Sequence, residues 1–198
     1  MSKIALTPNA SGTGTLTIAA PNTSTDRTLT LPDSTGTIDT LGRAGNVLQV
    51  VTTEKTDTFT TTSSSYVDVT GLSVSITPTS SSSKILVLFQ INGSQQVGAG
   101  RASLKLLRNS TVINAGAAAG SRTPALGGFS SADTSIPSTP VSGNYLDSPA
   151  TTSSTTYKIQ IAMTAGSGTA YINRTVLDND AADQIRMASQ ITVMEIAA

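Results

Sequence analysis

Apolar and polar residues alternate along much of the chain after residue 46, and the alternation is interrupted every eight to twelve residues by turn-forming residues. A period of two places alternate side chains on opposite faces of an extended strand, which is typical of β-sheet structure. The pattern predicts nine strands, over residues 47–52, 56–61, 66–77, 84–92, 102–108, 111–115, 155–164, 169–174 and 186–196. Short strands at this spacing indicate an all-β sandwich.

Two of these strands are apolar on both faces. In KILVLFQI, residues 84–91, Leu86 and Leu88 oppose the other apolar side chains, and in QITVMEI, residues 190–196, Met194 and Ile196 do so. A strand that is apolar on both faces is covered on both sides, whereas a two-layer sandwich covers only one. We therefore expect a second subunit to cover the outer face. In the strand over 66–77 the alternation changes parity at Gly71, which predicts a bulge or tight bend.

The first forty residues carry isolated apolar pairs, such as LTI and LTL, between prolines and glycines. These few residues are too sparse to offset the entropy of ordering the segment within one chain. Three copies around an axis would pool them into stacked apolar layers. The sequence thus predicts a stalk over 1–45 and a head over 46–198, with a disordered Thr/Pro-rich linker as the alternative for the first segment. The candidate trimer core of the stalk is Ile4, Leu6, Leu16, Ile18, Leu29, Leu31 and Ile38.

Composition narrows the possible chemistry. The 198 residues include 33 Thr and 27 Ser but no Cys, His or Trp, so disulfides, thiolate catalysis and histidine chemistry are excluded. Twelve basic residues balance twelve acidic ones, which gives no electrostatic footprint for nucleic acid. No apolar run approaches the roughly 20 residues that span a bilayer, so membrane insertion is not expected. No cofactor or metal site is expected either.

The segments SSSSKILVLFQI, YKIQIAM, GTAYIN and SQITVMEIAA together resemble the trimeric jelly-roll heads of the tumour-necrosis-factor and C1q type found in phage-encoded fibre proteins. The leading TLTIAAPNTSTDRTLTLPDSTGTI is similar to the N-terminal repeat of many marine-phage tail-fibre and virion structural proteins. The resemblance implies a homotrimer in the virion, with a jelly-roll β-sandwich head on a short β-stranded fibrous stalk. It implies a tail fibre or spike suited to binding a host-surface glycan. The alternative is a capsid decoration or head fibre that the N-terminal segment anchors to the major capsid protein.

The least regular stretch, residues 115–154, is rich in Gly, Ala, Ser and Pro. Long irregular loops often carry function, so we expect this stretch to act in recognition at the exposed end of the head. Its side chains able to stack on or hydrogen-bond a sugar are Arg122, Phe129, Asp133, Asn144, Tyr145 and Asp147. The alternative is an arm across the subunit interface, anchored by Phe129 and Tyr145.

Acidic residues form no recognisable catalytic motif, so the protein is not expected to be an enzyme and no catalytic residue is predicted. LDNDAAD, residues 177–183, lacks the glycine and distal glutamate of a calcium loop and is expected to be a solvated turn. Glu195 lies in an apolar strand. We expect it to pair with an arginine across an interface, the candidates being Arg101, Arg108 and Arg174.

Overall fold

The computed structural model describes residues 11–15, 17, 19, 22–26, 28, 43–96, 100–129 and 138–198. The chain divides into two compact units, Met1–Ile38 and Asp39–Ala198. None of the described residues of the first unit lies in a strand. All seven residues of the candidate stalk core (Ile4, Leu6, Leu16, Ile18, Leu29, Leu31 and Ile38) lie outside the described residues. The stalk and its trimeric core therefore stay predictions.

The second unit is all-β, with no helix among its described residues. Its strands are β1 (Val47–Lys55), β2 (Phe59–Thr61), β3 (Val67–Ile76), β4 (Lys84–Gln95), β5 (Arg101–Arg108), β6 (Thr111–Asn114), β7 (Gly127–Phe129), β8 (Thr139–Asp147), β9 (Thr155–Ala165), β10 (Ala170–Ile172) and β11 (Ser189–Ile196).

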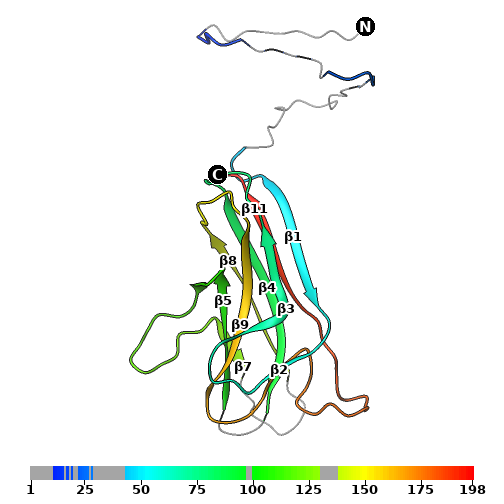
Figure 1. Ribbon diagram of the computed structural model, residues 1–198, viewed down its shortest axis with the longest axis vertical. Helices are drawn as coiled ribbons and strands as arrows, with labels where there is room; N and C mark the ends of the chain where they lie inside the picture. The colour runs from blue at the N-terminus through cyan, green and yellow to red at the C-terminus, as the bar shows by residue number, and fades with distance from the viewer. Residues whose placement is uncertain are drawn as a thin grey trace. The chain divides into compact units, whose positions relative to one another are not determined.

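The strands form two antiparallel sheets that face each other (Figure 1). In sheet A, β11 and β10 pair one after the other along the same edge of β4, and β8 pairs along its opposite edge; β1 is next to β11 and β2 is next to β10. Sheet B has the order β3-β9-β5-β6, with β7 also paired to β5. The pairings are nested, because β1 pairs with β11, β3 with β9, β4 with β8, and β5 with β6. Nested antiparallel pairing across two sheets is the jelly-roll winding. The predicted all-β jelly-roll sandwich is confirmed.

The core lies between the sheets and is built from the inward positions of alternating strands. From Lys84 to Gly93 in β4 the inward side chains are buried and the outward ones are half-buried or exposed, as the period of two requires. The same alternation holds along β11 and from Thr155 to Ile161 in β9. The largest fully buried apolar side chains are Tyr157, Phe129, Leu72, Ile85, Ile91, Leu104, Leu106, Ile159, Ile161, Ile172 and Ile191.

All nine predicted strands are present, with ends shifted by up to three residues. The bulge predicted at Gly71 is confirmed, because the β3–β9 register is irregular between Asp68 and Ser73 and Gly71 has φ of +80°. The buried side chain of Lys55 passes beside Gly71. The prediction of one irregular stretch over 115–154 is wrong in part, since β7 and β8 lie within it.

Gly93 in β4 is required by close packing rather than by backbone conformation. A Cβ at this position would lie 2.5 Å from Phe129 Cε2 and 2.6 Å from the backbone oxygen of Tyr171. We expect Gly93→Ala to destabilise the head by roughly 1–3 kcal/mol, the range for overpacking a filled core. Urea unfolding measures the change. Gly116→Ala is the matched control, because its nearest contact would be an unstrained 3.8 Å, and an equal loss in both variants would contradict this account.

The predicted pairing of Glu195 with an arginine across an interface is wrong, because Glu195 is fully buried within one chain. Its carboxylate is fully buried and accepts hydrogen bonds from Gln49 Nε2 at 2.6 Å and from the backbone nitrogen and Oγ1 of Thr79, both at 2.7 Å. Burial acts to raise the pKa of Glu195, but these neutral donors together outweigh it and lower the pKa to about 2. Glu195 thereby ties the β3–β4 turn to β1 and β11.

The lowered pKa of Glu195 predicts a stability effect in acid. The folded-state pKa is below the ordinary value of 4.5, so the charged carboxylate stabilises the fold above about pH 4.5, and this contribution is lost as the pH falls towards 2. We expect Glu195→Gln to flatten the dependence of unfolding free energy on pH across that window. Urea titrations at several pH values measure it. Exposed Glu54→Gln is the control, and an unchanged slope in Glu195→Gln would contradict the assignment.

Candidate functional site: the two outer faces of the sandwich

The six predicted recognition residues do not form one surface cluster. Arg122 is exposed in the turn after β6, where its Nη1 donates to the Ala119 oxygen. Asn144 is exposed on the outer face of β8, whereas the neighbouring Tyr145 points inward and packs against the core. Asp133 lies outside the described residues. Alternation along β8 thus separates Asn144 from Tyr145 on opposite faces of the sheet.

Phe129 is a core residue, and the expectation that its ring is free to stack on a ligand is wrong. Its side chain is 1% exposed and lies against Gly93 of the opposite sheet. β7 carries this ring into the sandwich by pairing with β5, Phe129 facing Ala102 in the register. Phe129 therefore anchors the end of the 115–129 segment to its own chain.

Asp147 is also buried, so its predicted role as a surface ligand is wrong. It is 5% exposed and accepts hydrogen bonds from Arg108 Nη1 at 2.8 and 2.9 Å and from Tyr157 Oη at 2.7 Å. Burial and the adjacent carboxylate raise the pKa of Tyr157, so the phenol stays protonated and donates. This Asp147–Arg108–Tyr157 cluster joins β8 of sheet A to β5 and β9 of sheet B.

The outer face of sheet A is apolar across four strands. The register places Val50, Met194, Leu86 and Leu146 in one row across β1, β11, β4 and β8. Val50 is 54% exposed and Leu146 57% exposed, while the two central members are half-buried. We call this set of four residues the apolar row.

The row on one side of the apolar row is also uncharged. One neighbouring row contains Thr52, Thr192, Leu88 and Asn144, and the two threonine hydroxyls hydrogen-bond each other at 2.8 Å. Towards the strand ends, Ile196 pairs with exposed Val47 and with Lys84. Interface cores are depleted of charge, and methionine is enriched in them. The apolar row and the row of Thr52, Thr192, Leu88 and Asn144 together have that composition, and Lys84 lies at its edge.

The outer face of sheet B has the opposite character. Asp68 accepts hydrogen bonds from Lys158 Nζ and Gln160 Nε2, both at 2.8 Å, and this pairing lowers the pKa of Asp68. Lys105 Nζ lies 3.9 Å from the centroid of the Tyr66 ring. Charged and hydrogen-bonded side chains such as these are well solvated, so this face is suited to water.

The prediction that two strands are apolar on both faces is confirmed. The residues that face outward from the core are Leu86 and Leu88 in β4 and Met194 and Ile196 in β11. Sequence reasoning missed that Val50 and Leu146 continue the same row. In β1 the sequence could have indicated the outward position of Val50, because Val50 and Thr52 alternate with Val51. In β8 no such alternation is visible, because its inward positions are not uniformly apolar.

The LDNDAAD segment forms the expected exposed turn between β10 and β11. Asp178 forms ion pairs with Arg186 at 2.8 Å and with Arg174 at 3.3 Å, so these two arginines compensate its charge. Across the described parts of the chain there is no group of three or more metal-ligating side chains. No helix in those same parts is long and apolar enough to cross a bilayer.

No protein-family model matches the chain, and no curated protein matches its sequence. Among solved structures, an infectious bursal disease virus Gt strain structure aligns with a TM-score of 0.40 and 15% identity over 87% of this chain and 42% of its own. The VP2 subviral particle of the same virus gives a TM-score of 0.37, 18% identity, and 84% and 41% coverage. The chain thus spans about two fifths of these proteins, and likenesses this distant assign it neither a family nor a function.

Proposed function

We propose that the protein is a non-enzymatic virion structural protein, a homotrimeric tail fibre or spike whose jelly-roll head is suited to host-surface recognition. The observation that carries the proposal is the contrast between the two outer faces of the head. Sheet A presents the uncharged apolar row, whereas sheet B presents ion pairs and amides.

The apolar row favours further copies of this chain as its occupant. In a closed ring of subunits each copy supplies the same residues, so every apolar row is covered without a separate partner. Gly45 and Asn46 pair with Ala197 where the chain enters the head, and they directly precede β1, the strand that contributes Val50 to the row. An assembly formed by sheet A therefore brings three entering segments together and favours the pooled stalk predicted over 1–45.

Two measurements test this proposal. The mass of the purified full chain in solution is expected to be about three times the 20.1 kDa of one copy. Immunogold or cryo-electron microscopy of intact particles is expected to place the protein at the tail. A single-chain mass would overturn the assembly. Label spread over the capsid would replace the fibre by the capsid decoration, anchored by the N-terminal segment, and absence from particles would overturn the virion role.

A further inference from the structure

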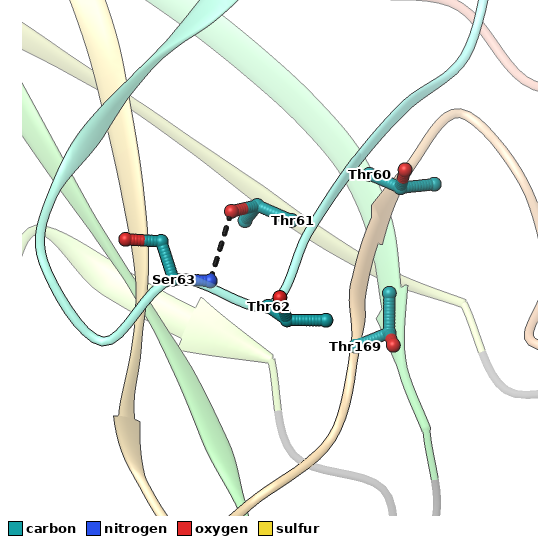
Figure 2. A pocket seen from close by; sticks show the side chains of 5 residues that line it. All are labelled: Thr60, Thr61, Thr62, Ser63 and Thr169. Carbon is teal, nitrogen blue, oxygen red and sulfur yellow. Dashed lines mark hydrogen bonds between the residues drawn. The ribbon is translucent and has the colours of Figure 1, made fainter.

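A shallow hollow of about 370 Å³ lies where β2 leaves sheet A and β10 begins. Its lining consists entirely of hydroxyl side chains, which are Thr60, Thr61, Thr62, Ser63 and Thr169 (Figure 2). β2 lies at the end of the head far from the C-terminus (Figure 1). The hollow thus lies away from the base where the chain enters the head, and it uses none of the residues predicted for recognition.

The antiparallel register explains how these side chains meet. Thr61 pairs with Ala170 and Thr60 with Tyr171, so Thr62 and Thr169 occupy the next opposed positions of the same ribbon. Thr60 and Thr62 are two residues apart and share one face of the strand. Three side chains of the lining, Thr60, Thr62 and Thr169, therefore come from two adjacent chain segments and border one open space.

Hydrogen bonding divides the lining into a fixed part and a free part. Thr61 Oγ1 accepts from the backbone nitrogen of Ser63 at 3.1 Å, and Ser63 Oγ donates to the Ser65 oxygen at 2.7 Å. The hydroxyls of Thr60, Thr62 and Thr169 form no hydrogen bond with another described residue. Each offers one donor and two acceptor positions to a ligand. The fixed pair holds the loop in shape beside three hydroxyls to which no other described residue hydrogen-bonds.

An aromatic ring lies next to these hydroxyls along the ribbon. Tyr171 is the cross-strand partner of Thr60, and the guanidinium of Arg174 lies 4.5 Å from the centroid of its ring. This cation–π contact restrains the ring. Tyr171 is not part of the lining, so a ligand on the hydroxyls would reach this ring only by extending along the ribbon past Thr60. A saccharide of several units could make both contacts, since its hydroxyls pair with polar groups and its C–H groups pack on aromatic surface.

The absence of charge in the lining selects the class of ligand. A second hollow, beside β7, contains Arg101, and a third, in the β10–β11 turn, contains Asp178, Asp180 and Arg186. The threonine hollow has no charged side chain in its lining, and the guanidinium of Arg174 beside Tyr171 is already paired with Asp178 at 3.3 Å, so a carboxylated or phosphorylated group finds no unpaired counter-charge there. We propose that this hollow binds a neutral saccharide of the host surface. This inference rests on the proposed function and adds the class of receptor to it.

The test is an array of neutral and acidic saccharides probed with the full-length protein, followed by calorimetric titration of the saccharide bound best. The variant carries Thr60→Val, Thr62→Val and Thr169→Val, which keep the β-branched shape and remove three hydroxyls. We expect the native protein to prefer a neutral saccharide and the variant to bind it at least about tenfold more weakly. Thr111→Val, at an exposed position on β6, is the matched control and is expected to bind normally.

Three results would overturn the inference: native binding to no saccharide, preference for acidic ones, or undiminished binding by the triple variant. Thermal unfolding and solution mass of the triple variant show whether the fold and assembly are retained. A failure here with a trimeric mass and tail localisation removes only the assigned receptor class. A single-chain mass or absence from particles instead removes the proposed function.

Discussion

Replacement of Val50 and Leu146 by aspartate is expected to convert the assembled protein into single chains of 20.1 kDa while each head stays folded. Both side chains are more than half exposed in the isolated chain, so their replacement leaves the core intact. In an assembly they lie in the apolar row, and each added carboxylate would be buried without a partner. Sedimentation or light scattering measures the mass, and circular dichroism measures the fold.

Val112→Asp provides the matched control for this experiment. Val112 is an exposed valine on β6 of sheet B, which is outside the apolar row. We expect this variant to retain the native mass. Loss of assembly in both variants would show that added charge alone breaks the complex, and a native mass in the double variant would show that sheet A is not the contact surface.

The fold could be predicted from the sequence wherever inward positions are uniformly apolar. β4 and β11 contribute Ile85, Val87, Phe89, Ile191 and Val193 to the core, and this regular alternation identified both strands and their two-sided character. Their outward leucines and methionine also identified the outer face of sheet A as apolar. Both are central strands of sheet A, and their inward positions face the core along most of their length.

β8 escaped prediction because its inward positions are chemically mixed. They are Thr139, Val141, Gly143, Tyr145 and Asp147, of which only two are apolar. Gly143 is small because the Phe89 ring fills the space beside it, a Cβ there lying 3.0 Å from Phe89 Cζ. A glycine chosen by a partner 54 positions earlier in the chain looks, in the sequence alone, like a loop residue.

The candidate sites show the same limit. Asp147 was selected as a surface ligand because it lies in the irregular 115–154 stretch and can hydrogen-bond a sugar, yet its partners are Arg108 and Tyr157, 39 and 10 positions away. The threonine hollow could not be predicted either, because no sequence pattern distinguishes its five Thr and Ser residues from the many others in the chain. Only strand pairing distinguishes Thr169 and Thr62 from the rest.

Replacement of Asp147 by asparagine is expected to give the second large effect, a loss of about 3 kcal/mol in the free energy of unfolding. The change removes the charge that compensates Arg108 and weakens the acceptor for Tyr157 Oη, while Arg108 stays only about a quarter exposed. Unpaired buried charge is costly, and here it lies between the two sheets. Urea unfolding of the full chain at pH 7 measures the loss.

Asp68→Asn is the control for Asp147→Asn, because Asp68 also accepts an ion pair at 2.8 Å but is half exposed. Water screens such surface pairs, so we expect a loss below about 1 kcal/mol. Equal losses in the two variants would contradict the assigned role of burial.

A triple variant separates the cost of an unpaired charge from the net value of the cluster. Asp147→Leu with Arg108→Leu and Tyr157→Phe replaces all three partners by apolar groups, and apolar replacements of buried ion pairs are often neutral. We therefore expect the triple variant to recover most of the stability that Asp147→Asn loses. Recovery would mean that the cluster fixes which side chains meet between β8 and sheet B, rather than supplying net stability. A loss as large as that of Asp147→Asn would mean that the ionic contacts themselves stabilise the sandwich.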